Sequence, residues 1–216
     1  MQSSEAIPGF SFGQMAFNEN ACNHIHMKTV GIDEVGRGPI AGPVAVGAFC
    51  FLNEKAKKYF RGVKESKQLS EKKREEWFAQ ILIRKKSGAI DFAVNFETEK
   101  VIDTKGLSFA IKRALRKSLS EVLPDPHSCK VLLDGGLKAP AEYTNQKTII
   151  KGDEKEMVIA LASICAKVLR DRKMNVLAKK YPNYGFEKHK GYGTRAHYKA
   201  IKKYGLLSTH RRSFIA

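Results

Sequence analysis

Residues 29–52 read TVGIDEVGRGPIAGPVAVGAFCFL, and this stretch decides the predicted fold. The β-branched run at residues 29–32 is typical of a short strand, and it ends at two carboxylates, Asp33 and Glu34. A turn rich in glycine and proline follows, and the apolar residues 43–52 then suit a buried strand. The stretch therefore predicts two neighbouring strands in a hairpin-like arrangement.

The rest of the chain alternates predicted helices and strands. Ser70 suits the N-cap of a helix, and Pro182 ends a long helix because the residue before a proline disfavours helical geometry. The predicted strands are residues 90–96, 131–133 and 148–150, and the later predicted helices are residues 107–122 and 154–180. A hairpin followed by alternating helices and strands indicates an α/β fold, with a mixed sheet covered by helices.

The composition places limits on the class of protein. The chain has 216 residues with a hydrophobic fraction of 43%, which suits one substantial domain or a core with a smaller appended unit. It contains no run of about 20 apolar residues, and residues 1–27 lack the features of a secretory signal. We therefore expect a cytoplasmic location and no membrane association. The four cysteines form no C-x-x-C pair, so we expect reduced thiols and no zinc site.

The positive charge is concentrated near the C-terminus. Lys and Arg total 39 against 22 Asp and Glu, which gives a net charge of +17. From Lys179 onward there are ten basic residues, one acidic residue (Glu187) and several interleaved aromatic residues. Basic side chains bind phosphates and aromatic faces stack on bases or sugars. This combination predicts nucleic-acid binding, and a solvated basic tail is the alternative.

Carboxylates stand near glycines at the ends of three strand-like runs. Asp33 and Glu34 follow the first run, Asp134 follows a later one, and Asp153 comes shortly after the last. Clustered carboxylates repel one another unless a cation neutralises them, and hard oxygen ligands select Mg²⁺ or Mn²⁺. Two such ions can promote hydrolysis of a phosphodiester. The pattern therefore predicts a metal-dependent nuclease.

Two considerations leave a plainer interpretation open. Adjacent residues on a regular strand point to opposite faces, so Asp33 and Glu34 share a site only if the strand ends there. An aspartate before a glycine, as at Asp134, is also a common turn residue.

A series of motifs resembles those of the ribonuclease HII family, in the family's order and over about residues 28–214. They are GIDEVGRGP at residues 31–39, AGPV at 41–44, KESKQLS at 64–70, LDG at 133–135, KGD at 151–153, ASICAKVLRD at 162–171, YGFEKHKGYGT at 184–194 and HRRSF at 210–214. The resemblance implies an RNase H-like fold, in which a mixed central sheet is flanked by helices and followed by a helical C-terminal extension. It divides the chain into an N-terminal extension of unassigned role (1–27), a catalytic domain (28–180) and a basic, aromatic-rich C-terminal region that completes the substrate cleft (181–216).

The resemblance also implies the site residues. Asp33, Glu34, Asp134 and Asp153 are the expected ligands of two Mg²⁺ or Mn²⁺ ions. Asp171 is a rival for the fourth place, and Asp153 is preferred because it is predicted to end a strand. The residues expected to bind substrate are Gly36, Arg37 and Gly38 at the ribose 2′-hydroxyl, Tyr192 at the sugar of an RNA-to-DNA junction, and Ser66, Lys67, Ser163, Lys167 and Arg170 at phosphates. Lys167 and Arg170 have an alternative role as the polar face of a helix.

The activity implied is cleavage of the RNA strand of RNA–DNA hybrids and on the 5′ side of single ribonucleotides in duplex DNA, leaving 5′-phosphate and 3′-hydroxyl ends. Departures from the family pattern are Glu65, where the family usually has Asp, and the extension at residues 1–27. Ribonuclease HIII carries a large N-terminal domain and usually a lysine at the place of Arg37, so the HII class is preferred. The alternatives are a non-catalytic hybrid-binding protein, a ribonuclease HIII-like enzyme or another nuclease of the same fold. Nucleic acid is the expected partner of a monomer, and a replication-clamp partner is left open.

Overall fold

The computed structural model describes residues 27–123 and 125–215, so nearly all of the predicted N-terminal extension lies outside the described residues. The first two strands form the predicted hairpin: β1 (Lys28–Val35) pairs antiparallel with β2 (Val44–Phe51). However, β1 is longer than predicted, because it continues through Asp33 and Glu34. The two carboxylates therefore lie on a continuous strand rather than beyond its end.

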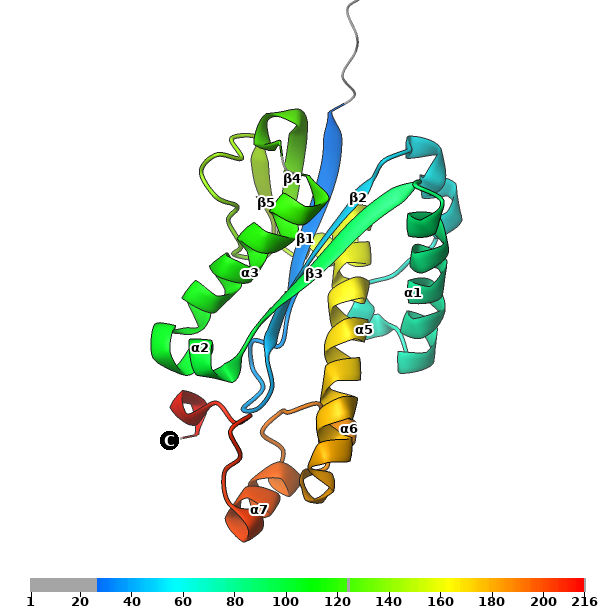
Figure 1. Cartoon of the computed structure of the whole chain (residues 1–216). Helices are drawn as coiled ribbons and strands as arrows, with labels where there is room; N and C mark the ends of the chain where they lie inside the picture. The colour runs from blue at the N-terminus through cyan, green and yellow to red at the C-terminus, as the bar shows by residue number, and fades with distance from the viewer. Residues whose placement is uncertain (1–26, 124, 216) are drawn as a thin grey trace, which may run out of the picture.

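Three further strands complete a mixed sheet in the order β3-β2-β1-β4-β5 (Figure 1). β3 (Ile90–Glu97) is antiparallel to β2, whereas β4 (Cys129–Asp134) is parallel to β1 and β5 (Gln146–Ile149) is parallel to β4. Parallel strands end at the same edge of a sheet. The carboxylates at the ends of β1 and β4 are therefore brought to one edge by the topology.

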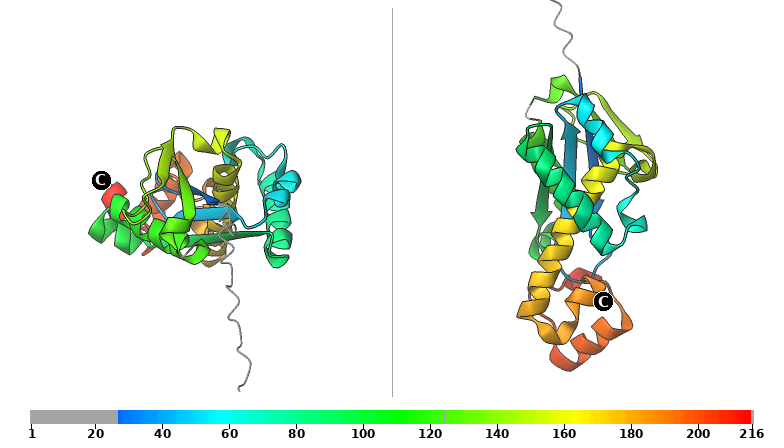
Figure 2. Two further views of the ribbon diagram at one scale, coloured as in Figure 1. Left: turned by 90° about the horizontal axis from the view of Figure 1, so that it is seen from above. Right: turned by 90° about the vertical axis from the view of Figure 1, so that its right-hand side faces the viewer.

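Helices cover both faces of this sheet. The helices of the described residues are α1 (Glu71–Lys86), α2 (Glu99–Lys105), α3 (Leu107–Val122), α4 (Gly152–Lys155), α5 (Met157–Lys180), α6 (Phe186–His189) and α7 (Arg195–Tyr204), with 3-10 turns η1 (Glu54–Phe60), η2 (Ser66–Gln68), η3 (Pro126–Ser128), η4 (Pro182–Tyr184) and η5 (Arg212–Phe214). The Ser70 hydroxyl caps α1 as predicted, because it accepts a hydrogen bond from the Lys73 amide at 3.2 Å. One apolar core lies between the sheet and α3, and a second lies between the sheet, α1 and α5 (Figures 1 and 2). The predicted α/β fold with a mixed sheet is confirmed.

Two glycines let α5 lie directly on the sheet. A side chain at Gly31 would overlap the backbone at Val158, and one at Gly47 would overlap the backbone at Ala162. Glycine is needed where two backbones approach this closely. The contact brings Ser163, the residue after Ala162, to the edge where the carboxylates of β1 lie.

The predicted helix over residues 154–180 is interrupted. Glu156 is extended, with φ −122° and ψ 115°, so α4 ends before α5 begins. Lys151 adopts the left-handed conformation and starts the turn into α4. Asp153 therefore lies in the first turn of a short helix, and the prediction that it ends a strand is wrong.

The C-terminal residues form a small unit beyond one end of the sheet, and α5 runs into it (Figures 1 and 2). Its own core contains Met174, Tyr184 and Phe186. Tyr184 and Phe186 stack on each other, with ring centroids 5.7 Å apart, so these two aromatic residues of the basic region serve packing rather than base stacking. Tyr192 and Tyr198 are exposed. No helix among the described residues is long and apolar enough to cross a membrane.

Candidate active site

Four carboxylates gather around the ends of β1 and β4. Asp33 and Glu34 come from β1, Asp134 is the last residue of β4, and Asp153 comes from α4. The parallel register of β1 and β4 sets Asp33 and Asp134 on neighbouring strands at the same level. Asp33 and Asp153 are only 6% and 5% exposed.

Burial raises the pKa of three of these carboxylates, Asp33, Glu34 and Asp153. Burial raises the pKa of Asp33 to about 8, and the charges of Glu34, Asp134 and Asp153 add to the effect, while the Ser163 side chain opposes it. The carboxylates are therefore close enough for the charge of one to raise the pKa of another. This holds even for Asp33 and Glu34, which are adjacent on β1 and would point to opposite faces of a regular strand.

Each carboxylate nevertheless has a different immediate neighbour. Asp33 accepts a hydrogen bond from the Glu34 amide at 2.8 Å, and Asp134 accepts one from the Gly152 amide at 2.6 Å. Glu34 accepts one from the Arg37 guanidinium at 3.1 Å. In residues 27–123 and 125–215, no three His, Cys, Asp or Glu side chains are placed so that they could hold a metal ion as they stand. The structure gathers the predicted ligands without arranging them as a coordination shell.

Two oxygens show that the site suits a cation. Glu34 Oε2 and Asp153 Oδ2 are buried and have no hydrogen-bond partner. The nearest cation to the latter is Lys67, whose Nζ lies 3.8 Å away. A buried charge without a partner is costly, and unpaired carboxylate oxygens are the ligands that Mg²⁺ and Mn²⁺ prefer. The donor set therefore fits a hard divalent cation.

The residues predicted to hold phosphates occupy different environments. Lys67 lies on η2 with its side chain 79% exposed, beside Asp153. Ser66 and Ser163 are buried, and their hydroxyls are hydrogen-bonded to each other at 2.8 Å, which fastens η2 to α5. Lys167 donates a hydrogen bond to Asp171 at 2.9 Å. Of these residues, Lys67 presents its charge to solvent most fully.

Asp171 lies in a separate, compensated site. Its carboxylate is buried, and the Lys167 ammonium is hydrogen-bonded to one oxygen; the other oxygen, like Asp153 Oδ2, has no hydrogen-bond partner, and the Arg74 guanidinium lies 3.7 Å from it. Asp153, by contrast, is among the charges that raise the pKa of Asp33. This arrangement favours Asp153 as the fourth carboxylate.

Arg170 does not lie at the predicted phosphate-binding surface. Its side chain is fully buried, and its guanidinium donates to the carbonyl of Pro43 at 3.0 Å and to that of Lys190 at 3.1 Å. Gly36, at φ +93°, leaves no space for a side chain beside this guanidinium. Arg170 thus supports the turn after β1, and its side chain does not lie on an exposed face of α5.

The turn after β1 and Tyr192 converge from opposite ends of the chain. Arg37, Gly38 and Tyr192 are exposed, and a Cβ atom on Gly38 would lie 3.6 Å from the Tyr192 ring. Arg37, which lies in this turn, forms an ion pair with Glu34, so this surface adjoins the carboxylates. The sequence motifs predicted these residues, and the structure brings them together.

Sequence reasoning missed the role of Arg211. Counted as one of the basic residues near the C-terminus, it is fully buried and donates to the carbonyls of Gly36, Arg37 and Gly42. The sequence signal for this role is the place of Arg211 in the HRRSF motif. Its charge alone groups it with the other basic residues near the C-terminus, for which phosphate binding is predicted.

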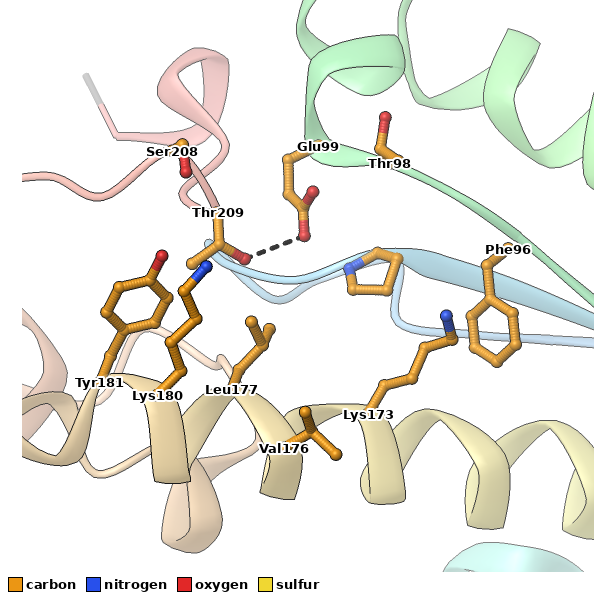
Figure 3. Close-up of a pocket in the computed structure, with 11 residues that line it drawn as sticks. Phe96, Thr98, Glu99, Lys173, Val176, Leu177, Lys180, Tyr181, Ser208 and Thr209 are labelled. Atoms are coloured by element: carbon orange, nitrogen blue, oxygen red, sulfur yellow. Dashed lines mark hydrogen bonds between the residues drawn. The ribbon is translucent and has the colours of Figure 1, made fainter.

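A cavity of about 580 Å³ lies between the C-terminal half of α5, the end of β3 and the start of α2 (Figure 3). Phe96, Lys173 and Leu177 contribute to its lining, and none of the predicted site residues does. At its edge the Thr209 hydroxyl donates to Glu99 at 3.0 Å, which ties the C-terminal segment to α2 (Figure 3). The cavity is therefore separate from the carboxylate site.

Comparison with known proteins agrees with this geometry. A family model described as Ribonuclease HII matches residues 30–216. A ribonuclease HII of Bacillus anthracis is 42% identical over 204 residues, which cover 94% of this chain and 75% of that protein. A ribonuclease HII of Endomicrobium trichonymphae is 42% identical over 199 residues, which cover 92% of this chain and 90% of that protein.

Solved structures show the same fold. The ribonuclease H2 of Pyrococcus horikoshii matches with a TM-score of 0.68 and 28% identity, covering 87% of this chain and 93% of that one. The RNase HII of Archaeoglobus fulgidus, in a complex with PCNA, matches with a TM-score of 0.67 and 25% identity, covering 85% and 93%. Bst-RNase HIII in complex with Mn²⁺ shares the fold, with a TM-score of 0.60 at 19% identity, over 83% of this chain and 63% of that one. With its motifs, sheet topology and carboxylate edge all in agreement, the chain belongs to the ribonuclease HII family of hydrolases.

Proposed function

We propose that this chain, acting as a monomer, cleaves the RNA strand of RNA–DNA hybrids and also cuts on the 5′ side of single ribonucleotides in duplex DNA, leaving 5′-phosphate and 3′-hydroxyl ends. One observation carries the proposal: a group of buried carboxylates with unpaired oxygens adjoins an exposed surface made of Arg37, Gly38 and Tyr192. The carboxylates suit metal-dependent hydrolysis, and the neighbouring surface suits recognition of a sugar.

Asp33, Glu34, Asp134 and Asp153 are the residues that would hold the ions, Mg²⁺ or Mn²⁺. When bound, such ions supply the positive charge that activates water and stabilises the leaving oxygen of a phosphodiester. Bst-RNase HIII, which shares the fold, has been solved in complex with Mn²⁺, and this is in keeping with a divalent cation here.

The chain's own residues orient the substrate. Lys67 is placed to attract a phosphate toward the carboxylates, because its ammonium is exposed and lies 3.8 Å from Asp153. The glycines at positions 36 and 38 let main-chain atoms approach a ribose 2′-hydroxyl, the group that distinguishes RNA from DNA. Tyr192 offers an exposed ring beside Gly38 on which a sugar can pack.

The test is cleavage of three labelled substrates with Mg²⁺ or Mn²⁺: a DNA duplex carrying one ribonucleotide, a long RNA–DNA hybrid and an all-DNA duplex. We expect both ribonucleotide-containing substrates to be cut, the first on the 5′ side of the ribonucleotide, and EDTA to stop both reactions. Cleavage of the hybrid alone would contradict the proposed recognition of a junction by Tyr192 and the glycine turn. Cleavage of all-DNA duplex would indicate another nuclease of this fold, and binding without cleavage of any substrate would indicate a hybrid-binding protein.

A further inference from the structure

A short C-terminal segment forms a strand-like pairing with the turn that links β1 and β2. His210 and Ala41 form an antiparallel bridge, and the Arg211 amide donates to the Ile40 carbonyl at 2.8 Å. The segment therefore lies against the same turn that carries the glycines at positions 36 and 38.

Arg211 binds this turn from the inside. Its Nη2 donates to the Gly36 carbonyl at 2.7 Å, its Nη1 to the Arg37 carbonyl at 3.0 Å and its Nε to the Gly42 carbonyl at 2.9 Å. One planar guanidinium thus contacts three carbonyls from three separate nitrogens in a fixed plane, whereas the donors of a lysine ammonium all lie on one nitrogen. Burial lowers the pKa of Arg211 to about 10, so the side chain is still protonated at neutral pH.

The neighbouring His210 begins a chain of hydrogen bonds that ends at Tyr192. The Leu207 amide donates to His210 Nδ1 at 2.8 Å, so the proton of this ring is on Nε2. His210 Nε2 lies 3.1 Å from His197 Nε2, which must then accept, leaving the His197 proton on Nδ1. His197 Nδ1 lies 2.9 Å from the Tyr192 carbonyl and donates to it.

This chain requires both imidazoles to be neutral. A second proton on His197 would go on Nε2, against the Nε2–H group of His210, and a second proton on His210 would go on Nδ1, against the Leu207 amide N–H. Both rings are buried, at 0% and 1% exposed, and burial lowers the pKa of each below the ordinary value. The stacked ring of His189, 4.3 Å from that of His197, closes the other side of the network.

We propose that His210 and Arg211 are positioning residues that hold Tyr192 in register with the turn at Gly36–Gly38. Arg211 fixes the turn and His210, through His197, fixes the backbone of Tyr192. Because the two residues are adjacent in sequence, one peptide unit joins the contact with the turn to the contact with Tyr192, and it adds to the hydrogen bonds that the Ile40 and Ala41 amides donate directly to the Gly191 carbonyl. Together, His210 and Arg211 form a C-terminal brace between the turn and Tyr192. The consequence for specificity rests on the proposed function: this brace should matter most for a single ribonucleotide, because one sugar must then contact both the turn and Tyr192.

The geometry can be tested without substrate by ¹⁵N NMR of the histidine rings in the full chain. At pH 7 we expect neutral rings, with the Nδ1–H form of His197 and the Nε2–H form of His210. A charged ring, or the Nε2–H form of His197, would overturn the proposed chain of hydrogen bonds.

The effect on specificity is tested with Arg211→Lys and His210→Phe, using Arg116→Lys as a matched control on α3, where the arginine is 65% exposed and pairs with Glu142. A displacement of about 1 Å in a positioned group can cost about a hundredfold in rate. We expect kcat/KM for the single-ribonucleotide duplex to fall at least about tenfold relative to that for the long hybrid. His210→Gln, which keeps a donor toward His197, should restore part of the ratio.

A purely structural role predicts a different result, namely equal losses on both substrates that follow the drop in melting temperature. A double-mutant cycle provides a second criterion: in a Tyr192→Ala background, His210→Phe should have little further effect on the ratio, since the pathway through Tyr192 is already removed. Equal losses or additive effects would overturn the inference.

The proposed function and this inference can fail separately. A wild-type chain that does not cut the single-ribonucleotide duplex contradicts junction recognition, whatever the variants do. In that case the ring tautomers still decide whether His210 and His197 hold Tyr192 as proposed.

Discussion

The carboxylate edge (Asp33, Glu34, Asp134 and Asp153) and the C-terminal brace (His210 and Arg211, with His197) both contain buried polar groups. They differ in whether these groups have hydrogen-bond partners. At the carboxylate edge, Glu34 Oε2 and Asp153 Oδ2 are buried without a hydrogen-bond partner. In the brace, both ring nitrogens of His197 and of His210 are hydrogen-bonded, and every guanidinium nitrogen of Arg211 donates to a carbonyl. The first region leaves carboxylate oxygens without hydrogen-bond partners, whereas in the second every ring and guanidinium nitrogen has one.

This difference separates residues that act on a ligand from residues that hold a shape. An unpaired buried carboxylate destabilises the fold and is retained where a cation is to be bound. A fully paired buried network costs less and specifies one arrangement of the backbone. Substitutions in the two regions should therefore differ in kind: the first should remove chemistry, and the second should alter stability and specificity.

The largest effect is expected for Asp134→Asn. A catalytic metal supplies several kcal/mol of transition-state stabilisation, and each 1.36 kcal/mol is a factor of ten in rate, so cleavage should fall by about a thousandfold or more. Hybrid binding should remain largely intact, as measured by fluorescence anisotropy. Glu142→Gln, at an exposed pair with Arg116, is the matched control. Unchanged turnover would show that the site is elsewhere.

The next comparison sets Asp153→Asn against Asp171→Asn. Asp171 neutralises Lys167 and Arg74 in a buried setting, so its loss should destabilise the fold by about 3 kcal/mol, measured by denaturant unfolding, while folded molecules still cleave. Asp153→Asn relieves repulsion among carboxylates, so it should leave stability unchanged or raised and abolish cleavage. The reverse outcome would assign the fourth carboxylate to Asp171.

A smaller effect is expected from pH. Burial lowers the pKa of His197 from 6.5 to about 4, so the unfolded chain binds more protons than the folded one between these values. Stability contributed by neutral His197 is therefore complete above about pH 6.5 and is lost as the pH falls toward 4. Unfolding free energy should drop by about 1–2 kcal/mol more between pH 7 and pH 5 in the wild type than in His197→Phe. Equal pH dependence in the two proteins would contradict a buried neutral ring.

The smallest effect is expected for Lys67→Met, measured in the Asp134→Asn background so that substrate is bound and not cut. Removing one phosphate contact should reduce the slope of log K against log salt by about 0.9 and weaken binding a few-fold at low salt. Lys100→Met on α2, also exposed, should leave the slope unchanged. A Lys67 variant with the wild-type slope would remove Lys67 from the phosphate contacts.

Local patterns were sufficient for most of the fold. The apolar run of β2 is buried at every position, the spacing of apolar residues over 107–122 matches α3, and the Ser70 cap lies where its sequence context indicates. These elements depend on side chains near in sequence, so their patterns can be interpreted without knowing the fold. The break between α4 and α5 is not visible in the sequence, because residues 154–180 contain no glycine or proline and only the extended backbone of Glu156 divides the two helices.

The sequence singled out candidate site residues, and the structure divides them between an exposed surface and buried supports. The sequence alone determined the candidates for the chemistry, because carboxylates beside strand-like runs and glycines in a turn are visible as residue types at given spacings. Only the tertiary structure decided that Lys67 faces solvent, that Arg170 and Arg211 are buried behind the turn, and that His210 reaches Tyr192 through His197. The physical reason is that a charged side chain looks the same in sequence whether it meets phosphate or carbonyl oxygens. Its burial and its partners are fixed by residues that the fold brings from far along the chain.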